Sequence, residues 1–106
     1  MFKTFRSYQL AVEFYRRCQE VRAPAFLKNQ LLRAASSIAL NLAEGTCKPS
    51  MKERRRFYFI ALGSLRECQA AMDLNGSINP GLKDLADHLG ACIYRLCNPK
   101  LERALK

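Results

Sequence analysis

Apolar residues recur at intervals of three and four along almost the whole chain, and no segment alternates strictly between apolar and polar residues. The first spacing is typical of one face of an α-helix, whereas alternation is typical of a half-buried strand. The helical spacing is interrupted only where prolines, glycines and asparagines occur. The sequence therefore predicts an all-α fold whose helices are joined by short connections.

Proline and glycine mark where three of the predicted helices end. Pro24 ends the first helix, because the residue before a proline avoids the α conformation. Gly45 ends the second, as a left-handed residue after the last turn. The Asn75–Gly76 pair ends the third in the same way. These signals come from the backbone preferences of single residues, so they depend little on the rest of the fold.

Capping residues mark where the later helices begin. Ser50 is followed three residues later by Glu53, the capping-box pattern of a helix start. Asn79 followed by Pro80 combines a capping residue with a proline suited to the first turn. We expect four helices, over residues 4–22, 25–44, 51–74 and 80–97, followed by a short C-terminal tail.

Four helices with short connections favour an antiparallel up-down four-helix bundle. The chain has 106 residues, 49% of them apolar and 25% charged. That is enough to bury one modest core without metal or disulfides, and it is not the composition of a disordered chain. We therefore treat residues 1–106 as one domain.

Cysteine usage and hydropathy indicate the cellular compartment in which the protein is expected. The five cysteines include no C-x-x-C pair, and four of them fall on apolar helical faces, where a free thiol packs as a small hydrophobe. The first 17 residues contain Arg6 and Glu13, which a signal peptide would not carry in its apolar segment. No stretch approaches the roughly 18 apolar residues of a membrane span. We expect a reduced, cytoplasmic protein.

The predicted helices carry more apolar surface than one bundle can bury. A monomeric bundle buries one face of each helix, yet the first helix is apolar around more than half of its circumference. The third helix has a core stripe that runs from Phe57 through Ile60 to Met72, and a second apolar line beside it. Contiguous apolar surface usually marks a contact between chains, although scattered apolar side chains are common on monomers. We expect a homo-oligomer whose interface contains Leu40, Phe59, Gly63, Ala70 and Leu74.

Polar residues border the core stripes of the second and third helices. An unpaired buried polar group costs about 1–3 kcal/mol, so such residues need partners. We expect a hydrogen-bonded polar seam between these two helices or between chains, with Arg33 or Arg66 available to pair a buried carboxylate. Its members are Ser37, Asn41, Glu44, Ser64 and Glu67.

The alternative is that Glu44 and Glu67 form a carboxylate pair for acid–base catalysis or metal binding. A di-metal site in a bundle requires Glu-x-x-His on two helices, but the chain has one histidine, His88, and Leu85 stands three residues before it. The sequence contains no G-x-S-x-G motif, Gly-rich phosphate loop or Cys/His/Asp constellation. We therefore expect no catalysis, no metal and no cofactor.

Positive charge is concentrated at one place in the chain. The 18 Lys and Arg residues exceed the 9 Asp and Glu residues, which gives a net charge of +9. Such an excess attracts polyanions, although it can also serve solubility alone. A cationic run at a helix N-terminus favours phosphate contacts without sequence specificity, with Tyr58 nearby for stacking; a solvated face is the other reading. We expect nucleic acid to contact Lys48, Lys52, Arg54, Arg55 and Arg56.

Two segments, QLLRAASSIALNLAEG (30–45) and KERRRFYFIALGSLRECQAAMDL (52–74), resemble the bacterial four-helix-bundle family of 23S rRNA intervening-sequence proteins. In the first segment the family motif falls on Gln30, Arg33, Ala34, Ser37, Ile38, Asn41, Ala43, Glu44 and Gly45. In the second it falls on Ala61, Gly63, Ser64, Leu65 and Glu67.

The resemblance implies an antiparallel four-helix protomer that assembles into a ring-like homopentamer with a basic surface. It also implies a relation to the accessory variability proteins of diversity-generating retroelements, whose partners are a reverse transcriptase and RNA. We therefore expect a non-enzymatic, RNA-binding homo-oligomer. An accessory adaptor that binds a reverse transcriptase and its RNA is the alternative.

Overall fold

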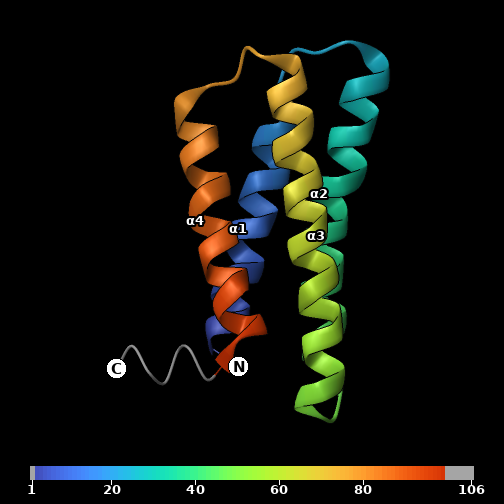
Figure 1. The fold of residues 1–106 in the computed structure, drawn as a ribbon, viewed down its shortest axis with the longest axis vertical. Coiled ribbons are helices and arrows are strands. Elements are labelled where there is room, and N and C mark those ends of the chain that lie inside the picture. Colours follow the sequence, from blue (N-terminus) through green and yellow to red (C-terminus); the bar gives the residue numbers. More distant parts are fainter. Residues whose placement is uncertain (1, 100–106) are drawn as a thin grey trace.

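The computed structural model describes residues 2–99, and within this range it contains four helices and no strand. The expected all-α class is confirmed, and the helices form a four-helix bundle (Figure 1). The last seven residues of the expected C-terminal tail, 100–106, lie outside the described range. The helices are α1 (Phe2–Cys18), α2 (Ala25–Thr46), α3 (Met51–Asn75) and α4 (Pro80–Cys97).

Each helix packs against two others: α2 contacts α1 and α3, and α4 contacts α3 and α1. The helices lie side by side along the 40 Å long axis, with the α1–α2 and α3–α4 connections at one end and the α2–α3 connection at the other (Figure 1). At 22 and 25 residues, α2 and α3 are longer than α1 and α4, which have 17 and 18. The end that α2 and α3 share therefore extends past the start of α1 and the end of α4 (Figure 1).

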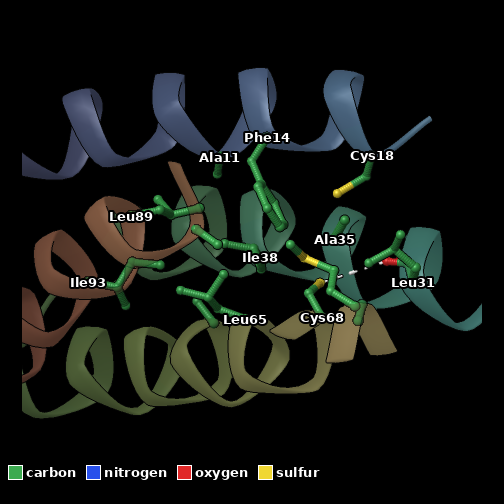
Figure 2. Packing of buried hydrophobic residues seen from close by; sticks show 14 of the residues in the cluster. Ala11, Phe14, Cys18, Leu31, Ala35, Ile38, Leu65, Cys68, Leu89 and Ile93 are labelled. Atoms are coloured by element: carbon green, nitrogen blue, oxygen red, sulfur yellow. Dashed lines mark hydrogen bonds between the residues drawn. The ribbon is translucent and has the colours of Figure 1, made fainter. Parts of the chain in front are cut away.

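The core lies between the four helices, and each helix contributes fully buried side chains (Figure 2). Each large apolar side chain buried in this way stabilises the fold by about 1.5–3 kcal/mol. On α4, Leu82, Leu89 and Ile93 are buried, and Leu85 and Leu96 pack half-buried against the core. The largest fully buried side chains are Phe14, Ile38, Leu42, Leu65, Leu89 and Ile93.

The predicted caps of α3 and α4 are confirmed. The Ser50 hydroxyl accepts a hydrogen bond from the Glu53 backbone N–H at 3.2 Å. The Asn79 side chain accepts one from the Gly81 N–H at 2.7 Å. Gly76 ends α3 with a φ of 82°, the left-handed conformation that glycine adopts at low cost.

Helix α1 ends at Cys18, four residues before the expected end at Arg22. The ammonium of Lys28, on α2, donates hydrogen bonds to the carbonyl oxygens of Gln19, at 2.7 Å, and of Val21. These carbonyls therefore have partners without a further helical turn. A cation at this end also complements the helix dipole.

The expectation for Gly45 was wrong. Helix α2 continues to Thr46, Gly45 is buried inside it, and Gly76 is the residue with positive φ in the described range. A Cβ atom at position 45 would lie 2.8 Å from Cε1 of Tyr58. Glycine is needed there because α2 and α3 approach closely.

The core face of α3 also differs from the expected one at its start. Ile60, which the predicted stripe placed in the core, is 44% exposed, whereas Tyr58 is 4% exposed. The Tyr58 hydroxyl lies 3.3 Å from Oγ1 of Thr4 on α1. The buried stripe of α3 therefore starts from Tyr58, which packs into the space left at Gly45.

Candidate nucleic-acid interface

The five cations expected to contact nucleic acid lie at the projecting end of the bundle (Figure 1). They belong to the α2–α3 connection and the first two turns of α3, and we call residues 48–57 the basic tip. Lys52, Arg55 and Arg56 are exposed, while Lys48 and Arg54 are half-buried. The projection leaves this charged region accessible at the end of the molecule.

Some of the cations of the basic tip gather around the side chain of Phe57. The Lys48 ammonium and the Arg56 guanidinium each lie 5.1 Å from the centre of the Phe57 phenyl ring. They line a surface pocket with Lys52 and Glu53. Three of the five cations therefore share one surface.

Two arginines of the basic tip face elsewhere. Arg54 turns toward the connection, where its Nε donates a hydrogen bond to the Lys48 carbonyl at 2.7 Å. Arg55 lies near Cys97 of α4: burial raises the pKa of the Cys97 thiol to about 11, and the charge of Arg55 partly offsets that rise. The sequence run alone did not indicate this division.

Two details of the expected nucleic-acid site need correction. The N-terminus of α3 already holds the chain's own anion, because the Ser50 hydroxyl donates to the Glu53 carboxylate at 3.3 Å and accepts from the Glu53 N–H. Tyr58 is buried and is not available for stacking. Phe57 is the aromatic residue next to the cations. The spacing of Tyr58 with Ala61 and Leu65 was the sequence signal that could have placed it in the core.

Three members of the expected polar seam lie together between α2 and α3. The Ser64 hydroxyl donates to the Ser37 hydroxyl at 2.9 Å, across the two helices. The Asn41 side-chain amide donates to the Ser37 hydroxyl at 3.0 Å and to the Ser37 carbonyl at 2.8 Å. This cluster joins the two helices within one protomer.

The two carboxylates of the expected seam lie outside this cluster and have different partners. Glu44 is exposed, and its Oε1 lies 4.0 Å from the Lys48 ammonium. Glu67 is exposed and accepts a hydrogen bond from Gln30 at 3.3 Å. Arg66 donates to Gln69 on its own helix at 2.7 Å rather than to a buried carboxylate. Glu44 and Glu67 are therefore not brought together as a catalytic pair.

The residues expected at the oligomer interface all lie on the surface of the protomer. Leu40 is 69% exposed, Phe59 50% and Leu74 79%. Gly63 and Ala70 are exposed as well, and a Cβ added at Gly63 would have no atom within 4 Å. Other large apolar side chains exposed on the protomer are Phe5, Tyr8, Phe26, Met51, Ile60 and Tyr94.

The remaining reactive residue types are dispersed. Burial raises the pKa of the Cys18 thiol to about 12, and it also raises the pKa of Cys68. His88 is exposed on α4, with its Nε2 4.0 Å from Sγ of Cys92. Within residues 2–99, no three His, Cys, Asp or Glu side chains are grouped in a way that could hold a metal ion. In the same range, no helix is both long enough and apolar enough to cross a bilayer.

Comparison with known proteins identifies the family. The family model described as 23S rRNA-intervening sequence protein matches residues 4–96. No curated protein and no solved structure matches the chain. The matched segment runs from the first turns of α1 to the last turn of α4 and includes both the polar seam and the basic tip. Since the match covers nearly the whole four-helix bundle, this chain belongs to the 23S rRNA-intervening sequence protein family.

Proposed function

We propose that this protein is a non-enzymatic RNA-binding homo-oligomer. Its protomer is an antiparallel up-down four-helix bundle, and several copies, five in the arrangement typical of the family, form a ring. The description of the family names 23S rRNA, which supports RNA as the ligand class. RNA is therefore the nucleic acid that we propose as the ligand.

The observation that carries the proposal is the basic tip. The basic tip lies at a projecting end of the bundle and contains five positive charges. The negative charges in its neighbourhood are Glu53, within the run, and Glu44, beside it. Exposed Lys and Arg residues bind nucleic-acid phosphates and release condensed counterions, which makes affinity depend strongly on salt. Contacts of this kind position a protein on RNA but do not read its sequence.

Assembly would explain the apolar surface of α2 and α3. An exposed glycine inside a helix costs about 1 kcal/mol relative to alanine, and no contact within the protomer requires glycine at position 63. Close approach of another helix is a reason to have glycine there. Burial of Leu40, Phe59 and Leu74 between copies would remove their apolar surface from water. Assembly would also bring several basic tips together, so that their positive electrostatic potentials add.

A filter-binding titration of the full chain against a structured RNA tests the proposal. We expect affinity to fall by at least tenfold between about 50 and about 200 mM salt. Removal of two tip charges in the Lys52→Gln/Arg56→Gln variant is expected to weaken binding. The control variant Lys83→Gln, which removes a charge from the exposed face of α4, should bind nearly as the wild type. Absent binding, or binding indifferent to salt, would overturn the proposal.

A further inference from the structure

Two of the cations in the basic tip lie over the same aromatic ring, that of Phe57. Lys48 comes from the α2–α3 connection and Arg56 from the second turn of α3, and both head groups lie 5.1 Å from the centre of the Phe57 ring. A cation over the face of a phenyl ring is attracted by the ring's quadrupole. This attraction offsets part of the mutual repulsion between two cations that line the same surface pocket.

Arg54 fixes the backbone at Lys48. The Nε of Arg54 donates a 2.7 Å hydrogen bond to the Lys48 carbonyl, and this contact is partly buried. A guanidinium bound to a backbone carbonyl has fewer donors and less freedom left for a ligand. Arg54 therefore orders the connection, whereas the exposed Arg55 has no such contact to position 48.

We propose that Lys48 and Arg56, held on Phe57, form a preorganised clamp for one phosphodiester group of RNA. Arg54 and Phe57 are positioning residues in this clamp. The inference rests on the proposed RNA binding and refines it, because it assigns different tasks to residues that the sequence presents as one charge run. Holding the two cations in place before RNA arrives lowers the entropic cost of binding.

The surroundings of the clamp favour a phosphate over other groups. The ammonium and the guanidinium both donate hydrogen bonds to anionic oxygens, and a guanidinium matches the geometry of phosphate. The pocket also contains Glu53, whose carboxylate accepts a hydrogen bond from Ser50. The exposed Glu44 carboxylate lies 4.0 Å from the Lys48 ammonium. Exposed pairs at this distance are weak, so a phosphate can take its place. A nucleobase stacking on the ring face beneath either cation would have to displace that cation.

Charge-conserving variants separate the clamp from a simple charge run. Arg54→Lys and Phe57→Leu both leave the net charge unchanged. We expect each to weaken binding of a fluorescein-labelled RNA hairpin by about three- to tenfold, as measured by fluorescence anisotropy. The slope of log affinity against log salt should become shallower by about one, because one phosphate contact is lost.

The matched controls are Arg16→Lys and Phe26→Leu. They make the same substitutions at exposed positions near the end of α1 and the start of α2, at the other end of the bundle from the clamp (Figure 1), and should leave both affinity and salt slope near the wild-type values. Phe57→Tyr keeps the aromatic ring and should bind RNA with the affinity of the wild type. Thermal unfolding of every variant gives its folded fraction, and a loss of stability alone would not change the salt slope.

The outcomes distinguish this inference from the proposed function. If the wild type binds RNA and Arg54→Lys binds with the same affinity and slope, the clamp is wrong while RNA binding stands. If Phe57→Leu does not fold, Arg54→Lys decides the question alone. If the wild type shows no salt-dependent binding, the proposed function fails and the clamp fails with it.

Discussion

At Gly45, α2 passes so close to the ring of Tyr58 that no side chain fits. A Cβ there would lie 2.8 Å from Cε1 of Tyr58 and 3.1 Å from Cβ of Phe57. Gly63 is also helical, but a Cβ there would meet no atom within 4 Å. The same substitution at the two positions should therefore have opposite effects on the protomer.

We expect Gly45→Ala to lower the free energy of unfolding by about 1–3 kcal/mol, because the added methyl group overpacks the α2–α3 contact. Gly63→Ala should raise it by up to about 1 kcal/mol, because alanine favours a helix interior. Urea unfolding at low protein concentration measures both. A Gly45→Ala variant as stable as the wild type would show that the contact relaxes freely.

The five free cysteines differ in exposure and therefore in reactivity. Cys47 is exposed, whereas Cys18, Cys68 and Cys97 are buried and burial raises their pKa values. Because the thiolate is the reactive form, we expect a thiol reagent at about pH 8 to modify Cys47 first. Mass spectrometry of the native protein after a short exposure identifies the modified site. Equal labelling of Cys18 would contradict the packing around α1.

The raised thiol pKa values also make stability depend on pH. The pKa of Cys18 is about 12 in the folded protein, against an ordinary value of 9.0. Its protonated thiol therefore contributes fully to stability below pH 9, and this contribution is lost as the pH rises toward 12. Replacing Cys18 by alanine should reduce the fall in unfolding free energy over that interval.

At the scale of the elements, α2 and α3 are joined by a hydrogen-bonded cluster in addition to their apolar contact. The Ser37 hydroxyl accepts from both Ser64 and Asn41. Ser36, its neighbour in sequence, instead donates to the Arg33 carbonyl of its own helix. The two adjacent serines therefore provide a matched pair of substitutions.

We expect Ser37→Ala to cost about 1–3 kcal/mol, because two half-buried donors lose an acceptor. Ser36→Ala should change the free energy of unfolding by no more than about 0.5 kcal/mol, since it affects only a contact within one helix. Chemical denaturation of the two variants measures the difference. Similar values for the two variants would mean that the cluster does not stabilise the helix pair.

At the scale of the whole molecule, we expect the exposed apolar residues of α2 and α3 to determine whether the chain assembles with copies of itself. We expect light scattering of the wild type at high micromolar concentration to report a mass well above the 12.1 kDa of one chain. The Leu40→Glu/Phe59→Glu variant should remain folded and have the mass of one chain, because the charges oppose burial of that face.

The control for this prediction is Tyr94→Glu, which changes a side chain on α4 that is 45% exposed and lies outside the proposed interface. It should assemble as the wild type does. A wild-type protein that keeps a mass of 12.1 kDa throughout would contradict the proposed assembly.

Local chemistry in the sequence was sufficient for the number and class of the elements. The caps at Ser50 and Asn79 and the left-handed Gly76 formed as predicted, because their signals act over three or four residues. The buried residues of α4, such as Leu82, Ala86, Leu89 and Ile93, also recur at the helical spacing of three and four residues. These features depend on backbone preference and helical period, and both can be deduced from the sequence alone.

Only the tertiary structure decided what depends on contacts between helices. It showed that Gly45 makes room for Tyr58 and that Lys28 accounts for the early end of α1. It also showed that the carboxylates of Glu44 and Glu67 lie apart from the serine–asparagine cluster, and that neighbouring arginines of the basic tip face different ways. A helical period gives the angle of a side chain around its own axis. The partner that the side chain meets is decided by how closely the next helix packs and what that helix carries.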